Sequence, residues 1–421
     1  MKQMLMPLLV LSVLVFACQK EQADVTPATE EIPSLVTKEA AEVAYFEAKL
    51  QGEITSIGTE NIYEYGFVWA ATPGPTTQTA SKKYFGPAAS ACVLTEKITG
   101  LAAGTTYYYR TFAITQAGIR YGNEVRFTTA AMPWVQTAEF AGAGRQLAVS
   151  FSIGGKGYCG IGSGEGITAL KDFWEFDPAA KTWTRKADFA GAPRSAAIAF
   201  SIGNKGYIGT GADNNGGSAL TYQDFWEYDP ATDKWTKKAD FPGGEVYYAA
   251  CFTIGNKGYV GTGIKNGTLL YDFYEYDPAA DRWTRKADFA GTPVDAAVGF
   301  SIGNKGYIGL GNRPLGSSKE FWEYNPATDQ WSRKKDFPGA AMYFATGFAL
   351  NGRGYVGLGS QGGTEFWEYN PGSDAWSRAV DFLGGSRENA TGFVIGNKAY
   401  VGTGYRGGYL KDVWAFMPAA H

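Results

Sequence analysis

The sequence predicts an all-β protein in which a small β-sandwich precedes a ring of repeated four-stranded sheets. Aromatic residues make up 15% of the 421 residues and glycine contributes 56 of them, whereas charged residues reach only 19%. This composition is typical of short strands joined by tight turns. Short strand-like stretches occupy residues 35–130, and a long repeat occupies the chain from Trp134 onward, so we expect two folded parts.

The N-terminal segment has the pattern of an export signal. Lys2 precedes an apolar run from Leu5 to Phe16, which is too short to span a bilayer as a helix. The run ends in Val-Phe-Ala-Cys, which resembles a bacterial lipobox. This resemblance implies that residues 1–17 are a signal peptide and that Cys18 is lipidated. An ordinary export signal with an incidental cysteine is the alternative.

The residues after the signal segment predict a tether and a location. Residues 18–34 are polar, with Thr, Pro and Glu, and are expected to be a flexible tether from the lipid. Their first letters, QKEQAD, resemble the acidic tag of some surface lipoproteins of Bacteroidota. We therefore expect an exported outer-membrane lipoprotein, exposed at the cell surface or facing the periplasm. Its contact with the membrane would be through the lipid only.

Residues 35–130 predict the small β-sandwich. Stretches such as YEYGFVWA and TYYYRTFAIT are separated by turns that contain glycine or proline. Residues 98–129 resemble the last strands of fibronectin type III-like domains in secreted Bacteroidota proteins, in which the run Gly-Leu-x-x-Gly-Thr-x-Tyr, here Gly100 to Tyr107, is a turn that enters a core strand. The resemblance implies that the tyrosines here pack in the core and do not contact a ligand.

The repeat predicts a β-propeller. Its tryptophans lie 49, 52, 48, 48 and 45 residues apart, at Trp134, Trp183, Trp235, Trp283, Trp331 and Trp376. Each repeat has an alanine-rich strand, a Gly-Tyr-x-Gly-x-Gly strand, a strand of the type DFWEYDP, and a basic strand that begins near the tryptophan. Successive four-stranded sheets of this length form propeller blades, and six repeats predict six blades. The basic residues of the fourth strand suit an exposed edge that resists pairing with another sheet.

This pattern resembles kelch repeats over residues 134–418. The tryptophan, the aspartate–proline turn and the spacing agree with that family, whose double glycine is replaced here by Gly-x-Gly. The resemblance implies a six-bladed kelch-type propeller over residues 134–421. The last repeat ends before a fourth strand, whereas residues 134–140 form an unattached strand before the first repeat. We therefore expect residues 134–140 to complete the last blade and close the ring.

Function is expected where the repeats differ, because residues that recur in every repeat are explained by the scaffold. The loops after the Gly-x-Gly strands vary and should share one face with the starts of the inner strands. They cover residues 163–171, 212–223, 264–271, 312–319, 360–364 and 405–411. This variable-loop face is the predicted binding face.

The residues at the starts of the inner strands are the candidate ligand contacts. They are Arg145, Arg194, Glu245, Tyr247, Tyr248, Asp295, Tyr343, Arg387 and Glu388. Arginine forks beside stacking aromatic rings suit a glycan, a sugar acid or another anionic polar ligand. In the alternative interpretation the arginines only tie the blades together, through backbone carbonyls and neighbouring acids.

Composition excludes several kinds of chemistry. The net charge of -3 gives no reason to expect nucleic-acid binding. The single histidine, His421, is too little for the copper site of the galactose oxidase fold, a histidine triad or a hydrolytic zinc site. The scattered Cys92, Cys159 and Cys251 predict small buried side chains and not a disulfide framework. We expect no metal, no cofactor and no identifiable catalytic residue.

The favoured interpretation is a lipid-anchored exported protein that binds a glycan or protein partner through the variable-loop face. A carbohydrate isomerase is the first alternative, because sialic acid mutarotase/epimerase propellers are similar in fold and need only acid, base and arginine side chains. Asp295, Glu388, Glu245, Arg194 and Arg387 would supply them. A structural envelope protein is the second alternative.

Overall fold

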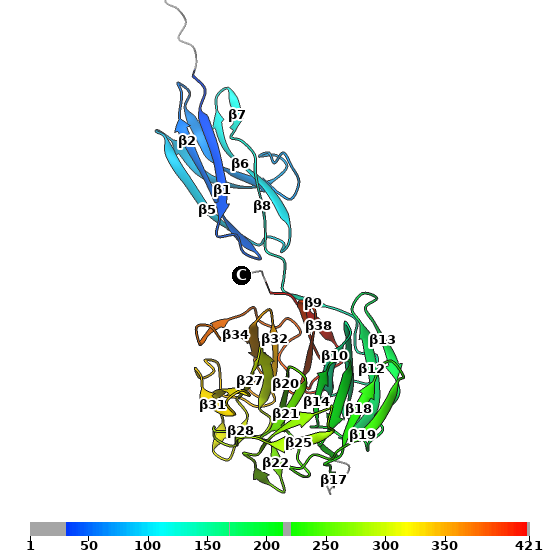
Figure 1. Cartoon of the computed structure of the whole chain (residues 1–421). Helices are drawn as coiled ribbons and strands as arrows, with labels where there is room; N and C mark the ends of the chain where they lie inside the picture. The colour runs from blue at the N-terminus through cyan, green and yellow to red at the C-terminus, as the bar shows by residue number, and fades with distance from the viewer. Residues whose placement is uncertain (1–30, 168, 214–219, 419–421) are drawn as a thin grey trace, which may run out of the picture. The chain divides into compact units, whose positions relative to one another are not determined.

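The computed structural model describes residues 31–167, 169–213 and 220–418, which divide into two compact units, with the boundary between Ala131 and Met132 (Figure 1). The predicted signal peptide, Cys18 and His421 lie outside the described residues. Antiparallel strands dominate both units, and the described residues contain no α-helix and one 3-10 turn, η1 (Glu165–Ile167). No helix in this part of the chain is long and apolar enough to cross a membrane. The predicted all-β class is confirmed.

The first unit contains two antiparallel sheets that share one core. One sheet has the strand order β1-β2-β5; the other has the order β4-β3-β6-β7, with β8 also paired to β6. The strands are β1 (Ser34–Ala41), β2 (Glu47–Ser56), β3 (Ile62–Ala70), β4 (Ser81–Ala88), β5 (Cys92–Thr99), β6 (Thr106–Thr115), β7 (Gly118–Tyr121) and β8 (Val125–Thr128). Leu50, Phe67 and Tyr109 are fully buried in this core, and Tyr107 packs against it. Tyr107 and Tyr109 therefore act as packing residues, as expected, whereas Tyr108 lies outside this core and lines a surface pocket.

The second unit contains six four-stranded antiparallel sheets, which we number in the order of their first strands. Sheets 1 to 3 are β10 (Val149–Ile153), β11 (Lys156–Ser163), β12 (Ala169–Asp177), β13 (Thr182–Lys186); β14 (Ile198–Ile202), β15 (Lys205–Gly209), β18 (Phe225–Asp229), β19 (Lys234–Lys238); and β20 (Ala250–Ile254), β21 (Lys257–Gly261), β24 (Phe273–Asp277), β25 (Arg282–Arg285). Sheets 4 to 6 are β26 (Val298–Ile302), β27 (Lys305–Gly309), β30 (Phe321–Asn325), β31 (Gln330–Arg333); β32 (Thr346–Leu350), β33 (Arg353–Gly357), β34 (Phe366–Asn370), β35 (Ala375–Arg378); and β36 (Thr391–Ile395), β37 (Lys398–Gly402), β38 (Val413–Phe416), β9 (Trp134–Gln136).

The sixth sheet joins the two ends of the unit. β9 pairs with β38, so that Trp134 lies opposite Phe416, and further backbone hydrogen bonds extend this pairing to Phe140. The first strands contact one another in chain order, and β36 of the last sheet contacts β10 of the first. The sheets therefore form a closed ring (Figure 1), and the predicted role of the segment that begins at Trp134 is confirmed.

The Gly-x-Gly motif links each sheet to the next. The second glycine donates its N–H to a carbonyl of the following sheet at 2.8–3.0 Å. The six links are Gly162 to Arg194, Gly211 to Val246, Gly263 to Val294, Gly311 to Met342, Gly359 to Arg387 and Gly404 to Arg145. These glycines have φ between 89° and 109°, which side-chain-bearing residues rarely adopt. At Gly211 a Cβ would lie 2.6 Å from the carbonyl oxygen of Ser195, so only glycine fits.

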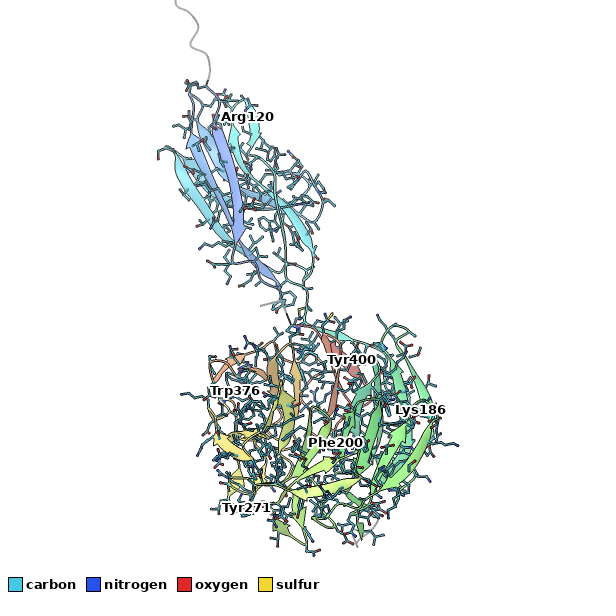
Figure 2. The ribbon with its side chains drawn as sticks, in the orientation of Figure 1. Arg120, Lys186, Phe200, Tyr271, Trp376 and Tyr400 are labelled. Atoms are coloured by element: carbon cyan, nitrogen blue, oxygen red, sulfur yellow. The ribbon has the colours of Figure 1, made fainter. Side chains whose placement is uncertain are left out.

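The repeated DFWEYDP phrase and the tryptophan after it join the outer parts of neighbouring sheets. The Asp233 carboxylate accepts hydrogen bonds from the Tyr228 hydroxyl at 2.7 Å and from the backbone N–H of Ala187 in the preceding sheet at 3.0 Å. Trp235 donates its indole N–H to the Ala187 carbonyl at 3.1 Å. Asp281, Asp329 and Asp374 repeat the arrangement. These contacts show that the repeated residues form the scaffold. In Figure 2, Phe200 lies inside the unit and Lys186 at its outer side.

Candidate functional site

A cavity of about 150 Å³ lies where the first strands of the six sheets begin. We call it the axial cavity. It is lined by Leu147, Ala148, Ala196, Ala197, Tyr248, Ala249, Ala296, Ala297, Phe344, Ala345, Asn389 and Ala390. Six of these residues, one at the start of each sheet, have φ between 50° and 57°: Leu147, Ala196, Tyr248, Ala296, Phe344 and Asn389. The backbone N–H groups of five of the six donate to the carbonyl of the equivalent residue in another sheet. Most of the other lining residues are alanines, whose small side chains let the six first strands converge on the axial cavity.

Each of these six residues is preceded in the chain by a residue that we call a rim residue, although none of the rim residues lines the axial cavity itself. The rim residues are Gln146, Ser195, Tyr247, Asp295, Tyr343 and Glu388. Each is hydrogen-bonded to the first residues of a variable loop; Asp295, for example, exchanges backbone hydrogen bonds of 3.1 and 2.8 Å with Asn312. Three of the loops continue as hairpins, β16 (Ala212–Asp213) with β17 (Leu220–Thr221), β22 (Ile264–Lys265) with β23 (Thr268–Leu269), and β28 (Asn312–Arg313) with β29 (Gly316–Ser317). The loops and the rim thus belong to one face.

The three predicted arginine contacts do not face the axial cavity. Arg145, Arg194 and Arg387 are at most 2% exposed and lie inside sheets 1, 2 and 6. In sheet 2, Arg194 donates to both carboxylate oxygens of Asp224, at 2.5 and 3.0 Å, and to the Thr210 carbonyl at 3.0 Å. Arg145 and Arg387 bind Asp172 and Asp412 in the same way. This geometry corrects the expected placement of the arginines and favours the alternative in which they tie the blades.

The carboxylate partners of the arginines are held in their charged form. Burial acts to raise the pKa of Asp224, but hydrogen bonds from Arg194 and Trp226 outweigh it, so the pKa lies below its ordinary value. Asp172 and Asp412 show the same balance. Sheets 3, 4 and 5 carry the buried Val246, Val294 and Met342 at the arginine position. The arginine pairs therefore occur in one contiguous half of the ring.

Aromatic side chains gather at the axial cavity in the other half of the ring. The rings of Tyr248 and Phe344 lie 5.2 Å apart between centroids, although they come from sheets 3 and 5. Tyr247 extends the group beside Tyr248 at 5.3 Å, and Tyr343 extends it beside Phe344 at 4.8 Å. The structure thus brings three predicted tyrosines together. Phe344 was not among the predicted contacts, although it occupies the same repeat position as Tyr248.

Two predicted carboxylates lie near the same aromatic group. Burial raises the pKa of Asp295, against a hydrogen bond with Asn312 that lowers it, and burial alone raises the pKa of Glu388. Burial, Asp295, Tyr247 and Glu388 together raise the pKa of Tyr248 to about 12. Neither carboxylate lines the axial cavity itself, and Glu388 lines a second pocket. Together they give the rim a negative charge.

The remaining predicted contact, Glu245, is exposed and lies outside the lining of the axial cavity. It accepts a hydrogen bond of 2.8 Å from Thr221 of the β16–β17 hairpin. A second pocket, of about 270 Å³, opens beside Glu388 and is also lined by Tyr405 and Arg406. No group of three or more metal-binding side chains occurs among the described residues. The described cysteines are free, with Cys159 buried and Cys92 and Cys251 half-buried.

A closed ring of four-stranded antiparallel sheets defines the second unit as a β-propeller. The solved structure of YjhT is similar to this chain, with a TM-score of 0.56 and 17% sequence identity, over 67% of this chain and 97% of that one. At this identity the likeness shows the fold alone. No family model and no curated protein matches the sequence.

Proposed function

We propose that the propeller binds a glycan or protein partner through the axial cavity and the variable loops around it. The observation that carries this proposal is the aromatic pair of Tyr248 and Phe344 together with the polar side chain of Asn389 at one small cavity. Ligand sites are typically concave, aromatic-lined and supplied with a few convergent polar groups. None of these groups recurs in all six repeats, so the scaffold does not account for them.

The test is binding of the full mature chain to glycan and peptide arrays, with and without the aromatic pair. Tyr248→Leu should abolish binding, because it removes one ring of the pair and leaves a smaller apolar side chain. Tyr63→Leu is the matched control, since Tyr63 is an exposed tyrosine of β3 in the first unit and belongs neither to the axial cavity nor to the variable loops. Equal binding by both variants would refute the assignment of the site.

We also propose the cellular context. The six sheets would be six blades of a kelch-type propeller, and the first unit a fibronectin type III-like sandwich. A signal peptide over residues 1–17, lipidation at Cys18 and export to the outer membrane are supported by the N-terminal sequence pattern. Metabolic labelling with a tagged fatty acid should mark the wild type and not Cys18→Ala. Labelling of both proteins would refute the lipid anchor.

A carbohydrate isomerase is the second candidate, because Asp295 and Glu388 have raised pKa values and both act on Tyr248. Carboxylates with raised pKa values are suited to proton transfer near neutral pH. The arginines no longer belong to this candidate, since they are buried in ion pairs. NMR measurement of anomer exchange in added sugars tests it; a rate enhancement that Asp295→Asn removes would favour an enzyme over a binding protein.

A further inference from the structure

The pocket beside Glu388 is separate from the axial cavity. It has a volume of about 270 Å³ and is formed by loops of sheets 5 and 6, and we call it the loop pocket. Its lining includes Ser360 after β33, Ser386 and Glu388 before β36, and Tyr405 and Arg406 after β37. None of these residues lines the axial cavity. Glu388 exchanges backbone hydrogen bonds of 3.2 and 2.9 Å with Tyr405, so the segments that carry Glu388 and Arg406 adjoin each other.

The loop pocket contains one negative and one positive side chain that are both available to a ligand. The Glu388 carboxylate and the Arg406 guanidinium make no hydrogen bond or ion pair with the described residues. Burial raises the pKa of Glu388, and no neighbouring cation acts against this shift. The other arginine of the lining, Arg387, is already paired with Asp412 at 2.8 Å. A ligand would therefore meet the charges of Glu388 and Arg406.

A glycine allows the Arg406 side chain to lie against the wall of the loop pocket. Gly385 has φ of 82°, and a Cβ there would overlap Nη1 of Arg406. The guanidinium thus lies against the segment that leads into β36. Lys265 has the same repeat position in sheet 3, where it lies against Gly244 and donates to the Gly243 carbonyl at 3.0 Å. Arg406 has no such acceptor among the described residues, so its N–H groups are available to a ligand.

Two opposite charges at one pocket favour a ligand that carries both. A guanidinium binds a carboxylate through two parallel hydrogen bonds, and charge-assisted bonds of this kind are about twice as strong as neutral ones. An ammonium group would pair with the Glu388 carboxylate in the same way. Because Glu388 and Arg406 line one pocket and form no ion pair with each other, a small ligand can lie between them. Ser360 accepts the Tyr343 N–H at 3.2 Å and can donate its own O–H to a ligand carboxylate.

We propose that the loop pocket binds a free α-amino acid, with its carboxylate on Arg406 and its ammonium group on Glu388. This inference goes beyond the proposed function, because the loop pocket and the axial cavity share no lining residue. The volume of about 270 Å³ has room for the main-chain atoms and the side chain of an amino acid. A ligand with only one of the two charges leaves either Glu388 or Arg406 unpaired and binds more weakly.

The experiment first screens the full mature chain for thermal stabilisation by each standard L-amino acid, since a ligand that binds only the folded state raises the melting temperature. Calorimetry then compares the most stabilising amino acid with two derivatives. Its amide lacks the negative charge, and its N-acetyl derivative lacks the positive charge. Each derivative should bind at least about tenfold more weakly than the amino acid, because one ion pair is missing.

Two variants test the assigned role of each charge. Glu388→Gln and Arg406→Gln should each weaken the amino acid at least about tenfold. Glu388→Gln should weaken the amide and spare the N-acetyl derivative, whereas Arg406→Gln should do the reverse; a variant that weakens both derivatives alike would overturn the assignment. Arg282→Gln, on the exposed outer strand β25, and Glu64→Gln, in β3 of the first unit, are the matched controls and should leave every affinity unchanged.

The other outcomes separate this inference from the proposed function. If no amino acid binds, or if a derivative binds as tightly as the amino acid itself, the inference is overturned and the axial cavity keeps its own test on the arrays. Loss of amino-acid binding in Tyr248→Leu would also overturn it, because this would place the ligand in the axial cavity. Unchanged binding in Tyr248→Leu together with lost binding in Glu388→Gln would support the loop pocket.

Discussion

Replacing Arg194 by methionine should destabilise the propeller without touching its ligand site. Arg194 is 0% exposed, and its guanidinium is paired with a carboxylate that is itself only 22% exposed. Methionine occupies the equivalent position of sheet 5, at Met342, where it is buried. The substitution is therefore compatible with the fold, and its cost should come from leaving Asp224 charged and unpaired.

The expected loss of stability is about 3 kcal/mol at pH 7, the lower end of the range for breaking a buried ion pair, because Asp224 keeps some access to water. In a domain of this size this corresponds to a fall of about 6–12 °C in the melting temperature. The folded pKa of Asp224 lies below its unfolded value, so the stabilisation is present above about pH 4 and is lost as the pH falls through the folded pKa. The difference between wild type and Arg194→Met should accordingly shrink towards pH 3.

The assay is thermal and urea denaturation of Arg194→Met, Asp224→Asn and the double variant. The double variant should recover about 2 kcal/mol relative to the sum of the single effects, since no unpaired charge remains. Glycan binding should be the same in all folded variants. An unchanged melting temperature together with lost binding would refute the reasoning and return Arg194 to the ligand site.

Three further predictions concern the ring and its rim. Gly211→Ala should lower the free energy of unfolding in urea by about 3 kcal/mol, because Gly211 has a φ of 92° and a Cβ there would meet the Ser195 carbonyl. Gly203→Ala is the control and should lower it by about 1 kcal/mol, since Gly203 has a φ of 59° and open space around it. Equal losses would contradict the role of the Gly-x-Gly links. Trp134→Ala should lower the free energy of unfolding by about 3–5 kcal/mol, since Trp134 is 2% exposed in the sheet that closes the ring. Val135 is exposed in the same strand, so Val135→Ala should change the free energy of unfolding by less than about 0.5 kcal/mol. Similar losses in the two variants would argue against ring closure through β9. Asp295→Asn should raise the melting temperature at pH 7 and not at pH 3. The raised pKa of Asp295 means that its charged form, which is populated above that pKa, destabilises the folded state, whereas the neutral form below it does not. A gain of equal size at both pH values would show that charge burial is not the cause.

The scaffold could be predicted from the sequence because the residues that build each sheet recur in every repeat. The Trp134 spacing, the Gly-x-Gly strands and the surplus strand at one end predict a closed ring of sheets, and the hydrogen bonds of Gly211 and Asp233 explain why those residues repeat. The resemblance to kelch repeats supplied the family pattern for the same residues.

The site was only partly readable, because position in a repeat does not give the direction of a side chain. Arg194 and Tyr248 lie only two repeat positions apart at the starts of their strands, yet the first turns into its sheet towards Asp224 and the second lines the axial cavity. The signal for this was present in the sequence, because an acid begins the third strand of every repeat, as Asp224 does before Phe225, and offers a partner to an arginine. The unpaired oxygen of Asn389 has no sequence signature, since it depends on how Gln146 uses the amide.

The buried arginines and the aromatic residues of the cavity are the two departures from sixfold repetition, and they fall in complementary halves of the ring. This distribution suggests how the site is built. Sheets 6, 1 and 2 use buried arginines to bind the carbonyl of the residue between the two glycines, as Arg194 does at Thr210. Sheets 3 to 5 have apolar side chains there, and sheets 3 and 5 place Tyr248 and Phe344 at the cavity instead. The backbone links through the second glycine are the same in all six sheets, so side chains can differ without opening the ring. A ligand site on one side of the axis is therefore compatible with a scaffold that keeps its repeat intact.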